Sequence, residues 1–174
     1  IDARLFALTV LLSSYFMYNS IGAIDEMSIN TLSLITHLIK TVALEENKKL
    51  VSEYQISQFA PKLLWILRDF ILEIKDTQGR IVTAPQYLES ALMDVIPGAK
   101  GSSKDSQKSY QIRQSLINFF KSRDCLTMVR PVNDESELRN IQHLRDEQIR
   151  PDFLNSLHSI RNKIYKNCTQ KVIN

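Results

Sequence analysis

Leu63-Leu64-Trp65-Ile66-Leu67-Arg68-Asp69 is the stretch of sequence that decides the fold. Its five successive apolar residues predict a short strand buried on both faces, and burial on both faces is typical of parallel sheets. The apolar run ends abruptly at two charged residues, Arg68 and Asp69. Apolar runs at residues 5–12 and 125–129 predict two further strands of the same kind.

Helical patterns lie between these three runs. Asp25 or Ser28 can cap a helix whose apolar residues keep a 3.6-residue period through Val42. Residues 83–86, Thr-Ala-Pro-Gln, form a capping box that opens a short helix, and residues 110–120 form another helix. Strands that alternate with helices imply right-handed βαβ crossovers and a parallel sheet covered on both faces. We therefore expect an α/β fold, a three-layer sandwich whose sheet is incomplete because three strands are few for an independent sheet.

The remaining segments are expected to be connections and terminal helices. Residues 45–53 are a solvated connection, residues 76–79 are a turn, and residues 98–109 are a polar, mobile loop. Two amphipathic helices are expected after the third strand. Pro151 starts the second of them, and the first carries the apolar residues Leu138, Ile141, Leu144 and Ile149.

The composition of the 174 residues excludes several classes of protein. With 22 Lys and Arg against 19 Asp and Glu, the net charge of +3 is too small to indicate binding of nucleic acid. The strongest apolar run, residues 6–18, is shorter than the ~20 residues that span a bilayer. Cys125 and Cys168 have no partners at metal-ligand spacing, and the three histidines are isolated on helical patterns. No metal site and no catalytic residue are expected, and the default location is the cytoplasm.

Polar residues follow each predicted strand, and they are the candidates for a binding site. In an open parallel sheet, ligands bind at the carboxyl ends of the strands. Here those ends are Asn19-Ser20, Arg68-Asp69 and Arg130-Pro131. Asp69, directly after the most apolar strand, is the sharpest feature, although an aspartate after a strand can also be a turn or capping residue.

Short motifs distributed along nearly the whole chain carry a family resemblance. The matching stretches are Phe6-Ala7-Leu8, Leu11-Leu12-Ser13-Ser14, Tyr18-Asn19-Ser20-Ile21-Gly22, Trp65-Ile66-Leu67-Arg68-Asp69-Phe70, Thr83 with Tyr87-Leu88, Ile112-Arg113 with Phe119-Phe120, Cys125, Arg130-Pro131-Val132 and Pro151-Asp152-Phe153. With these motifs the sequence resembles the guanylate-binding protein family of large, dynamin-related GTPases. The resemblance implies a parallel sheet of the P-loop-GTPase type.

The resemblance also implies a role for Arg68 and Asp69. They correspond to the family's arginine-aspartate motif for guanine specificity. A carboxylate suits this role, because it can accept hydrogen bonds from both N1–H and the exocyclic amine of guanine, a donor pair that adenine lacks. For Arg68 two interpretations stay open: its side chain lies in the nucleotide pocket, or it supports the pocket through neighbouring backbone.

A second candidate segment is Arg130, Pro131 and Val132. By resemblance these residues enter the loop that covers the guanine base and that forms part of a nucleotide-dependent dimer face. The alternative is a solvated loop with Arg130 on the surface. The sequence continues with the acidic residues Asp134 and Glu135, which argues against a dimer contact made by paired arginines.

The sequence departs from a complete GTPase in one respect: it contains no G-x-x-x-x-G-K-[ST] motif. Asp76 and Gly79 have the spacing of Asp-x-x-Gly, but they follow the specificity motif instead of preceding it. We therefore expect residues 1–174 to be the carboxyl-side portion of a large G domain, with residues 135–174 as its terminal helices. The P-loop, the switch region and the Mg²⁺ ligands are expected upstream, so that these residues alone do not hydrolyse GTP.

Two classes of function follow for the intact protein. The first is a GTPase that binds GTP and GDP with Mg²⁺ and forms a nucleotide-dependent homodimer. The second is a non-catalytic α/β protein-interaction module derived from the same fold. Membrane association, as in atlastin-like GTPases, would additionally need a transmembrane or lipidated segment.

Overall fold

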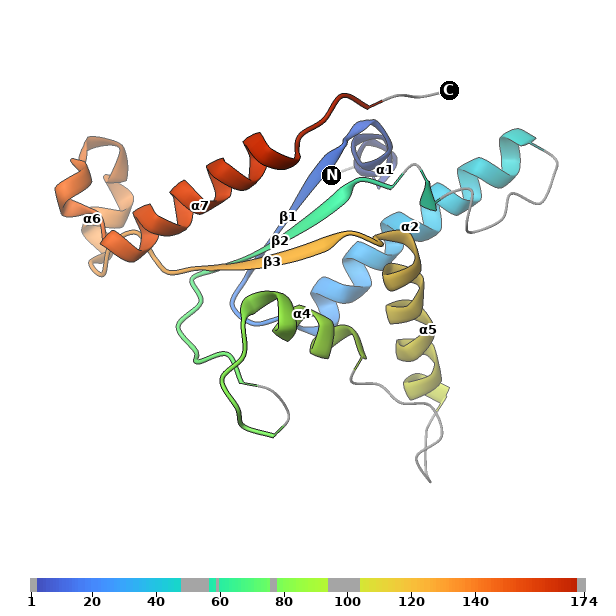
Figure 1. Cartoon of the computed structure of the whole chain (residues 1–174), viewed down its shortest axis with the longest axis horizontal. Helices are drawn as coiled ribbons and strands as arrows, with labels where there is room; N and C mark the ends of the chain where they lie inside the picture. Colours follow the sequence, from blue (N-terminus) through green and yellow to red (C-terminus); the bar gives the residue numbers. More distant parts are fainter. Residues whose placement is uncertain (1–2, 48–56, 59, 76–77, 94–103, 172–174) are drawn as a thin grey trace.

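The computed structural model describes residues 3–47, 57–58, 60–75, 78–93 and 104–171, with a three-stranded sheet at its centre (Figure 1). The strands run parallel in the order β1-β2-β3. Tyr18 and Cys125 lie in register with Trp65 on its two sides. The predicted parallel sheet is confirmed, as are its second and third strands. The strands are β1 (Tyr15–Ile21), β2 (Lys62–Arg68) and β3 (Arg123–Met128).

The side chains of β2 alternate between two hydrophobic cores, one on each face of the sheet. Leu63, Trp65 and Leu67 belong to the larger core, whereas Leu64 and Ile66 belong to the smaller one. The predicted three-layer arrangement is thus confirmed, with helices on both faces (Figure 1). The larger core is covered by α1 (Ala3–Leu12), α2 (Glu26–Asn47), α4 (Ala84–Met93) and α5 (Lys104–Phe119), and the smaller core by α7 (Pro151–Asn167).

The first predicted strand is wrong, because residues 5–12 lie in helix α1. Ala7 and Val10 are buried, and their spacing of three residues is helical. Leu5, Leu8 and Leu12 are 61%, 51% and 55% exposed, so the helix is apolar on its outer side as well. An apolar run of this length looks the same whether it covers both faces of a strand or all sides of a helix. The true strand, β1, begins at Tyr15.

Two predicted helix caps are confirmed. The carboxylate of Asp25 accepts a 2.7 Å hydrogen bond from the amide of Ser28, at the start of α2. The amide of Thr83 donates to the side chain of Gln86 at 2.9 Å, and the amide of Gln86 donates back to the hydroxyl of Thr83 at 3.4 Å. This is the reciprocal pattern of a capping box. Hydrogen bonds from Ser28 also hold the pKa of Asp25 below its usual value.

The predicted polar loop at residues 98–109 is wrong in its second half, because α5 already begins at Lys104. Residues 98–103 lie outside the described part. Lys, Asp and Gln are not helix breakers, and Asp105 in the first turn is favourable for the helix dipole. Of the expected connection at 45–53, residues 45–47 belong to α2 and the rest lie outside the described residues. Of the expected turn at 76–79, only Gln78 and Gly79 are described, and Gly79 has φ +78°.

The first predicted amphipathic helix after the sheet is also wrong. The segment is divided into a short helix and two 3-10 turns. Asn140 ends the short helix, because its amide donates to the carbonyl of Glu137 and its backbone leaves the helical conformation. The second predicted helix is confirmed as α7, which begins at Pro151 as expected. The three short elements are α6 (Glu135–Arg139), η1 (Ile141–His143) and η2 (Asp146–Gln148).

Candidate functional site

The carboxyl ends of the three strands form one continuous edge of the sheet. Ile21, Arg68 and Met128 lie side by side in the parallel register. Beyond this row, the amide of Gly22 donates to the carbonyl of Arg68 at 2.7 Å, and the amide of Phe70 donates to the carbonyl of Met128 at 3.0 Å. The backbone on both sides of Asp69 is therefore held by hydrogen bonds to both neighbouring strands.

Asp69 has an unusual backbone conformation. Its φ of +53° places it in the left-handed region, where it is the one non-glycine residue among those the structure describes. This conformation costs an L-residue about 1 kcal/mol, and such strain is concentrated at functional sites. The Asp69 side chain is 38% exposed, so its carboxylate lies at the surface and is not buried in the core.

Arg130 lies opposite Asp69. Its Nε is 3.9 Å from Oδ2 of Asp69, while its Nη1 donates a 2.8 Å hydrogen bond to Oε1 of Glu135. The pKa of Arg130 is raised, first by the hydrogen bond to Glu135 and also by the charges of Glu135 and Asp69. Arg130 is therefore a cation placed between two carboxylates, and it is bonded to only one of them.

Pro131 and Val132 follow Arg130 but are buried. Val132 is 2% exposed, and the carbonyl of Pro131 accepts a 2.8 Å hydrogen bond from the amide of Arg150. These two residues fix the base of the loop. Of the predicted loop residues, Arg130 alone reaches Asp69 with its side chain.

Arg68 is exposed at the end of β2. Its carbonyl takes part in the hydrogen bond to Gly22 described above, so its backbone helps to fix the strand end. This hydrogen bond agrees with the second interpretation of Arg68, in which the residue supports the pocket through the backbone.

Sequence reasoning missed the part that Glu135 takes in this site. Asp134, the residue before it, caps α6 by accepting hydrogen bonds from the amides of Ser136 at 2.6 Å and Glu137 at 3.3 Å. These bonds, those from Ser136 foremost, hold the pKa of Asp134 below its usual value. Glu135 is consequently the first residue of a capped helix. The signal in the sequence was an acid-rich capping motif a few residues after Arg130, but the pairing with Arg130 depends on the turn between them.

A buried hydrogen bond joins β1 and β2 close to the carboxyl edge of the sheet. Nε1 of Trp65 donates to the hydroxyl of Ser20 at 2.9 Å, and Tyr18 contacts the Trp65 ring edge-on at 5.0 Å between ring centroids. Tyr18 in turn donates a 3.2 Å hydrogen bond to the carbonyl of Ser28. Ser20, which the sequence placed at a strand end, is therefore engaged in the core.

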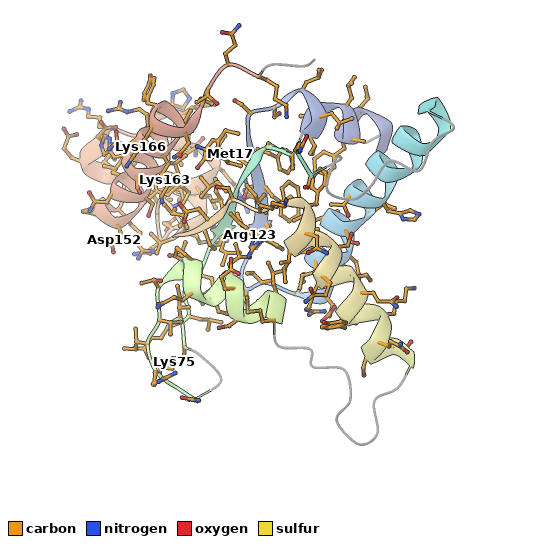
Figure 2. The ribbon with its side chains drawn as sticks, turned by 45° about the vertical axis from the view of Figure 1, so that its right-hand side comes forward. Met17, Lys75, Arg123, Asp152, Lys163 and Lys166 are labelled. Carbon is orange, nitrogen blue, oxygen red and sulfur yellow. The ribbon has the colours of Figure 1, made fainter. Side chains whose placement is uncertain are left out.

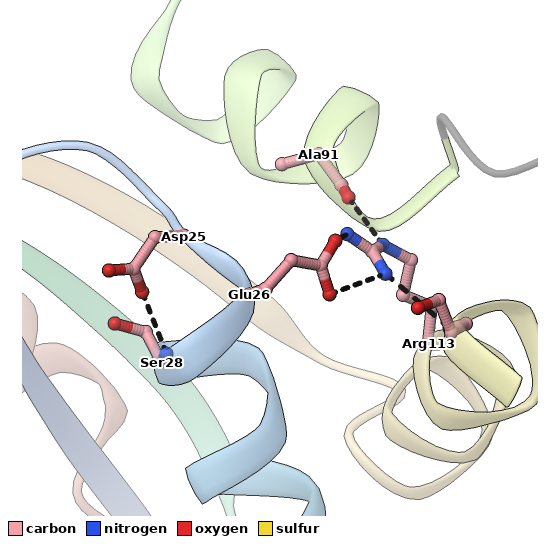
Figure 3. Close-up of polar contacts among 6 residues, drawn as sticks. Asp25, Glu26, Ser28, Ala91 and Arg113 are labelled. Atoms are coloured by element: carbon pink, nitrogen blue, oxygen red, sulfur yellow. Dashed lines mark hydrogen bonds and ion pairs between the residues drawn. The ribbon is translucent and has the colours of Figure 1, made fainter. Parts of the chain in front are cut away.

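Arg113 forms a second polar centre, away from the strand ends (Figure 3). It is 6% exposed, binds the carboxylate of Glu26, and donates to the carbonyls of Ala91 at 3.1 Å and Ser109 at 3.4 Å. It thereby joins α2, α4 and α5. A cavity of about 640 Å³ lies between α2 and α5, and none of the strand-end residues lines it.

A third group of charges ties β3 to its two flanking helices, and two of its members, Arg123 and Lys163, are labelled in Figure 2. Arg123 binds Glu89 of α4 through hydrogen bonds of 2.8 and 2.7 Å. Asp124 pairs with Lys163 of α7. Near Asp124, burial raises the pKa of Tyr15 to about 12, and the buried Tyr15 hydroxyl has no hydrogen-bond partner among the residues that the structure describes.

Within the described ranges, no three His, Cys, Asp or Glu side chains gather in a way that could hold a metal ion. The helices in those same ranges are all too short or too polar to cross a membrane.

Comparison with known proteins gives one consistent family. The family model for the guanylate-binding protein N-terminal domain matches residues 1–173. Guanylate-binding protein 7 of Mus musculus is 32% identical over 175 residues, which cover 99% of this chain. Guanylate-binding proteins 4 and 6 of Homo sapiens are 31% and 30% identical over the same share. The chain spans only 27% of the length of each of these relatives.

Proposed function

This chain belongs to the guanylate-binding protein family, and from that membership we propose that the carboxyl edge of its sheet recognises the guanine base of GTP and GDP. The single observation that carries the proposal is the position of Asp69. Its half-exposed carboxylate follows the central strand, at the edge where parallel sheets bind ligands. Its left-handed backbone, fixed from both sides, supports a functional role.

The chemistry of the base fits this carboxylate. Guanine presents N1–H and the exocyclic amine as two adjacent donors, and the two oxygens of Asp69 are matching acceptors. Adenine presents no such pair, so it would leave the carboxylate without partners. A site built around polar contacts rejects a ligand that lacks them far more strongly than an apolar pocket does.

The other predicted residues have supporting parts in this proposal. Arg68 fixes the end of β2 through its backbone and presents its exposed side chain beside Asp69. Arg130 covers the base from the neighbouring loop, in the same segment that we propose as part of a nucleotide-dependent homodimer face. Pro131 and Val132 hold that loop in place from the interior.

Hydrolysis of GTP is proposed only for the intact protein. The residues described here do not fit a Mg²⁺ site, because they bring no three suitable ligands together and the sequence holds no P-loop motif. In the intact protein, other segments would bind Mg²⁺ and the phosphates, and the bound Mg²⁺ would neutralise phosphate charge. In this proposal, the role of residues 1–174 is to select the base. We propose a cytoplasmic location, with membrane association as a separate question.

One observation favours the second candidate function, a protein-interaction module. Leu5, Leu8 and Leu12 give α1 an apolar outer side, which a protein surface could cover. The two functions differ in one measurable property. A recognition site for guanine responds to changes at Asp69, whereas an interaction module without nucleotide chemistry does not.

The test is Asp69→Asn in the intact protein, with equilibrium binding of GDP, ADP and xanthosine diphosphate. The amide cannot accept both guanine donors, so GDP binding should weaken about 30-fold. Xanthine carries a carbonyl in place of the exocyclic amine, so the new amide donor should improve binding of xanthosine diphosphate. Asp152→Asn, at an exposed aspartate of α7, is the matched control. Unchanged preference for GDP in Asp69→Asn would remove Asp69 from the site and favour the interaction module.

A further inference from the structure

Glu135 shares Arg130 with Asp69, the residue proposed to read guanine. Arg130 is bonded to Glu135 at 2.8 Å and stays 3.9 Å from Asp69. We infer that Glu135 is a positioning residue for guanine recognition: by holding the Arg130 guanidinium, it keeps the Asp69 carboxylate open to the base. This inference rests on the proposed function of Asp69.

The two distances describe two different kinds of contact. A separation of 2.8 Å between Nη1 of Arg130 and Oε1 of Glu135 is that of a charge-assisted hydrogen bond. A separation of 3.9 Å between Nε and Oδ2 is too long for a hydrogen bond, so only the attraction of opposite charges remains. Both oxygens of Asp69 can therefore still accept hydrogen bonds from a ligand.

The position of Glu135 is set by the loop around it. Asp134 caps the first turn of α6 through the amides of Ser136 and Glu137, which places Glu135 at the start of that turn. On the other side, the bond between the Pro131 carbonyl and the Arg150 amide anchors the loop that carries Arg130. The donor and the acceptor of the Arg130–Glu135 bond are thus both carried by segments that hydrogen bonds hold in place.

Without the Glu135 charge, Asp69 is the carboxylate that remains beside Arg130 among the described residues. Arginine binds a carboxylate in a two-pronged geometry that occupies both oxygens. The two donors of guanine would then have to displace the guanidinium. The three side chains are 41%, 38% and 64% exposed for Arg130, Asp69 and Glu135, and ion pairs in water contribute little to folding stability. The effect is therefore expected in ligand binding and not in the fold.

The first experiment compares GDP with inosine diphosphate in the intact protein. Inosine lacks the exocyclic amine, so the ratio of the two affinities reports on the second contact with Asp69. Glu135→Gln should weaken GDP binding roughly two- to fivefold, because an exposed ion pair must be broken. The preference for GDP over inosine diphosphate should fall as well. Loss of structure alone would weaken both ligands equally. Glu137→Gln, at an exposed glutamate of the same helix, is the matched control and should bind GDP as the unmodified protein does.

The second experiment repeats Glu135→Gln in a protein that already carries Arg130→Gln. With no guanidinium to release, the Glu135 substitution should have no further effect on GDP binding. An equal loss with and without Arg130, or no loss in either background, overturns the inference. Asp69→Asn separates the two proposals. If Asp69→Asn lowers GDP binding while Glu135→Gln does not, the positioning role fails alone; if neither does, both proposals fail.

Discussion

The indole of Trp65 donates a buried hydrogen bond to the hydroxyl of Ser20, and this bond joins the central strand to β1. Trp65 is fully buried and Ser20 is 9% exposed, so water cannot replace either partner. A buried donor without an acceptor is destabilising. Ser20 therefore contributes to stability more than a serine usually does.

We predict that Ser20→Ala lowers the free energy of unfolding by about 1–3 kcal/mol, because Nε1 of Trp65 loses its acceptor. Chemical denaturation of the variant measures the loss. Trp65→Phe removes the donor and much ring volume. In that background, Ser20→Ala should cost clearly less than it does alone. Additive losses would mean that the hydrogen bond does not stabilise the sheet.

Arg113→Met is predicted to lower the free energy of unfolding by about 2 kcal/mol. Two carbonyl acceptors, on Ala91 and Ser109, each lose a side-chain donor, and the buried anchor between three helices is removed. Glu26 is 57% exposed and regains water, which limits the loss.

Arg139→Met on α6 is the control for Arg113→Met. Arg139 is an exposed arginine, so its substitution should change stability by less than about 0.5 kcal/mol. Equal effects of the two substitutions, measured by denaturation, would contradict the structural importance of Arg113.

Stability should fall as the pH rises through the alkaline range. Burial raises the pKa of the Cys125 thiol from 9.0 to about 12, and that of the Tyr15 hydroxyl from 10.0 to about 12. In this window the folded chain keeps protons that the unfolded chain has released. The stabilisation is thus complete below pH 9 and lost towards pH 12.

The measurement for this prediction is the free energy of unfolding as a function of pH. The variant Cys125→Ala with Tyr15→Phe lacks both groups, so its stability should fall less steeply over the same window. The Tyr15→Phe change also removes a buried hydroxyl that has no partner in the described part of the chain, and it should not itself be destabilising. Identical slopes for the two proteins would refute the assignment.

The central strand was the part of the fold that the sequence predicted best. Its apolar residues alternate between two cores, so every position of the run carries the same signal. The prediction of a strand at residues 5–12 was wrong, because the sequence of α1 does not show the usual pattern of a helix. Leu5, Leu8 and Leu12 are exposed apolar residues, so α1 lacks the polar face by which a helix is normally recognised in a sequence. Only tertiary contacts distinguish a strand that is buried on both faces from a helix that is apolar on all sides.

The position of Asp69 and Arg130 at one edge of the sheet was predictable, but the geometry around them was not. Asp69 and Arg130 could be identified because both follow strands, and parallel strands end at one edge. The left-handed backbone of Asp69 could not be predicted, because it results from hydrogen bonds to both neighbouring strands. The same holds for Glu135, whose contact with Arg130 depends on how the turn at Asp134 folds.

The hydrogen bonds on either side of Asp69 have a consequence for motion. One reaches β1 through the Arg68 carbonyl, and the other reaches β3 through the Phe70 amide. If either outer strand slides or frays, the peptide units flanking the carboxylate must rotate with it. The amides of Gly22 and Phe70 should accordingly exchange with deuterium slowly and together, as members of one cooperative unit. The proposed selection of the base would then depend on this unit, and it would be lost whenever the unit opens.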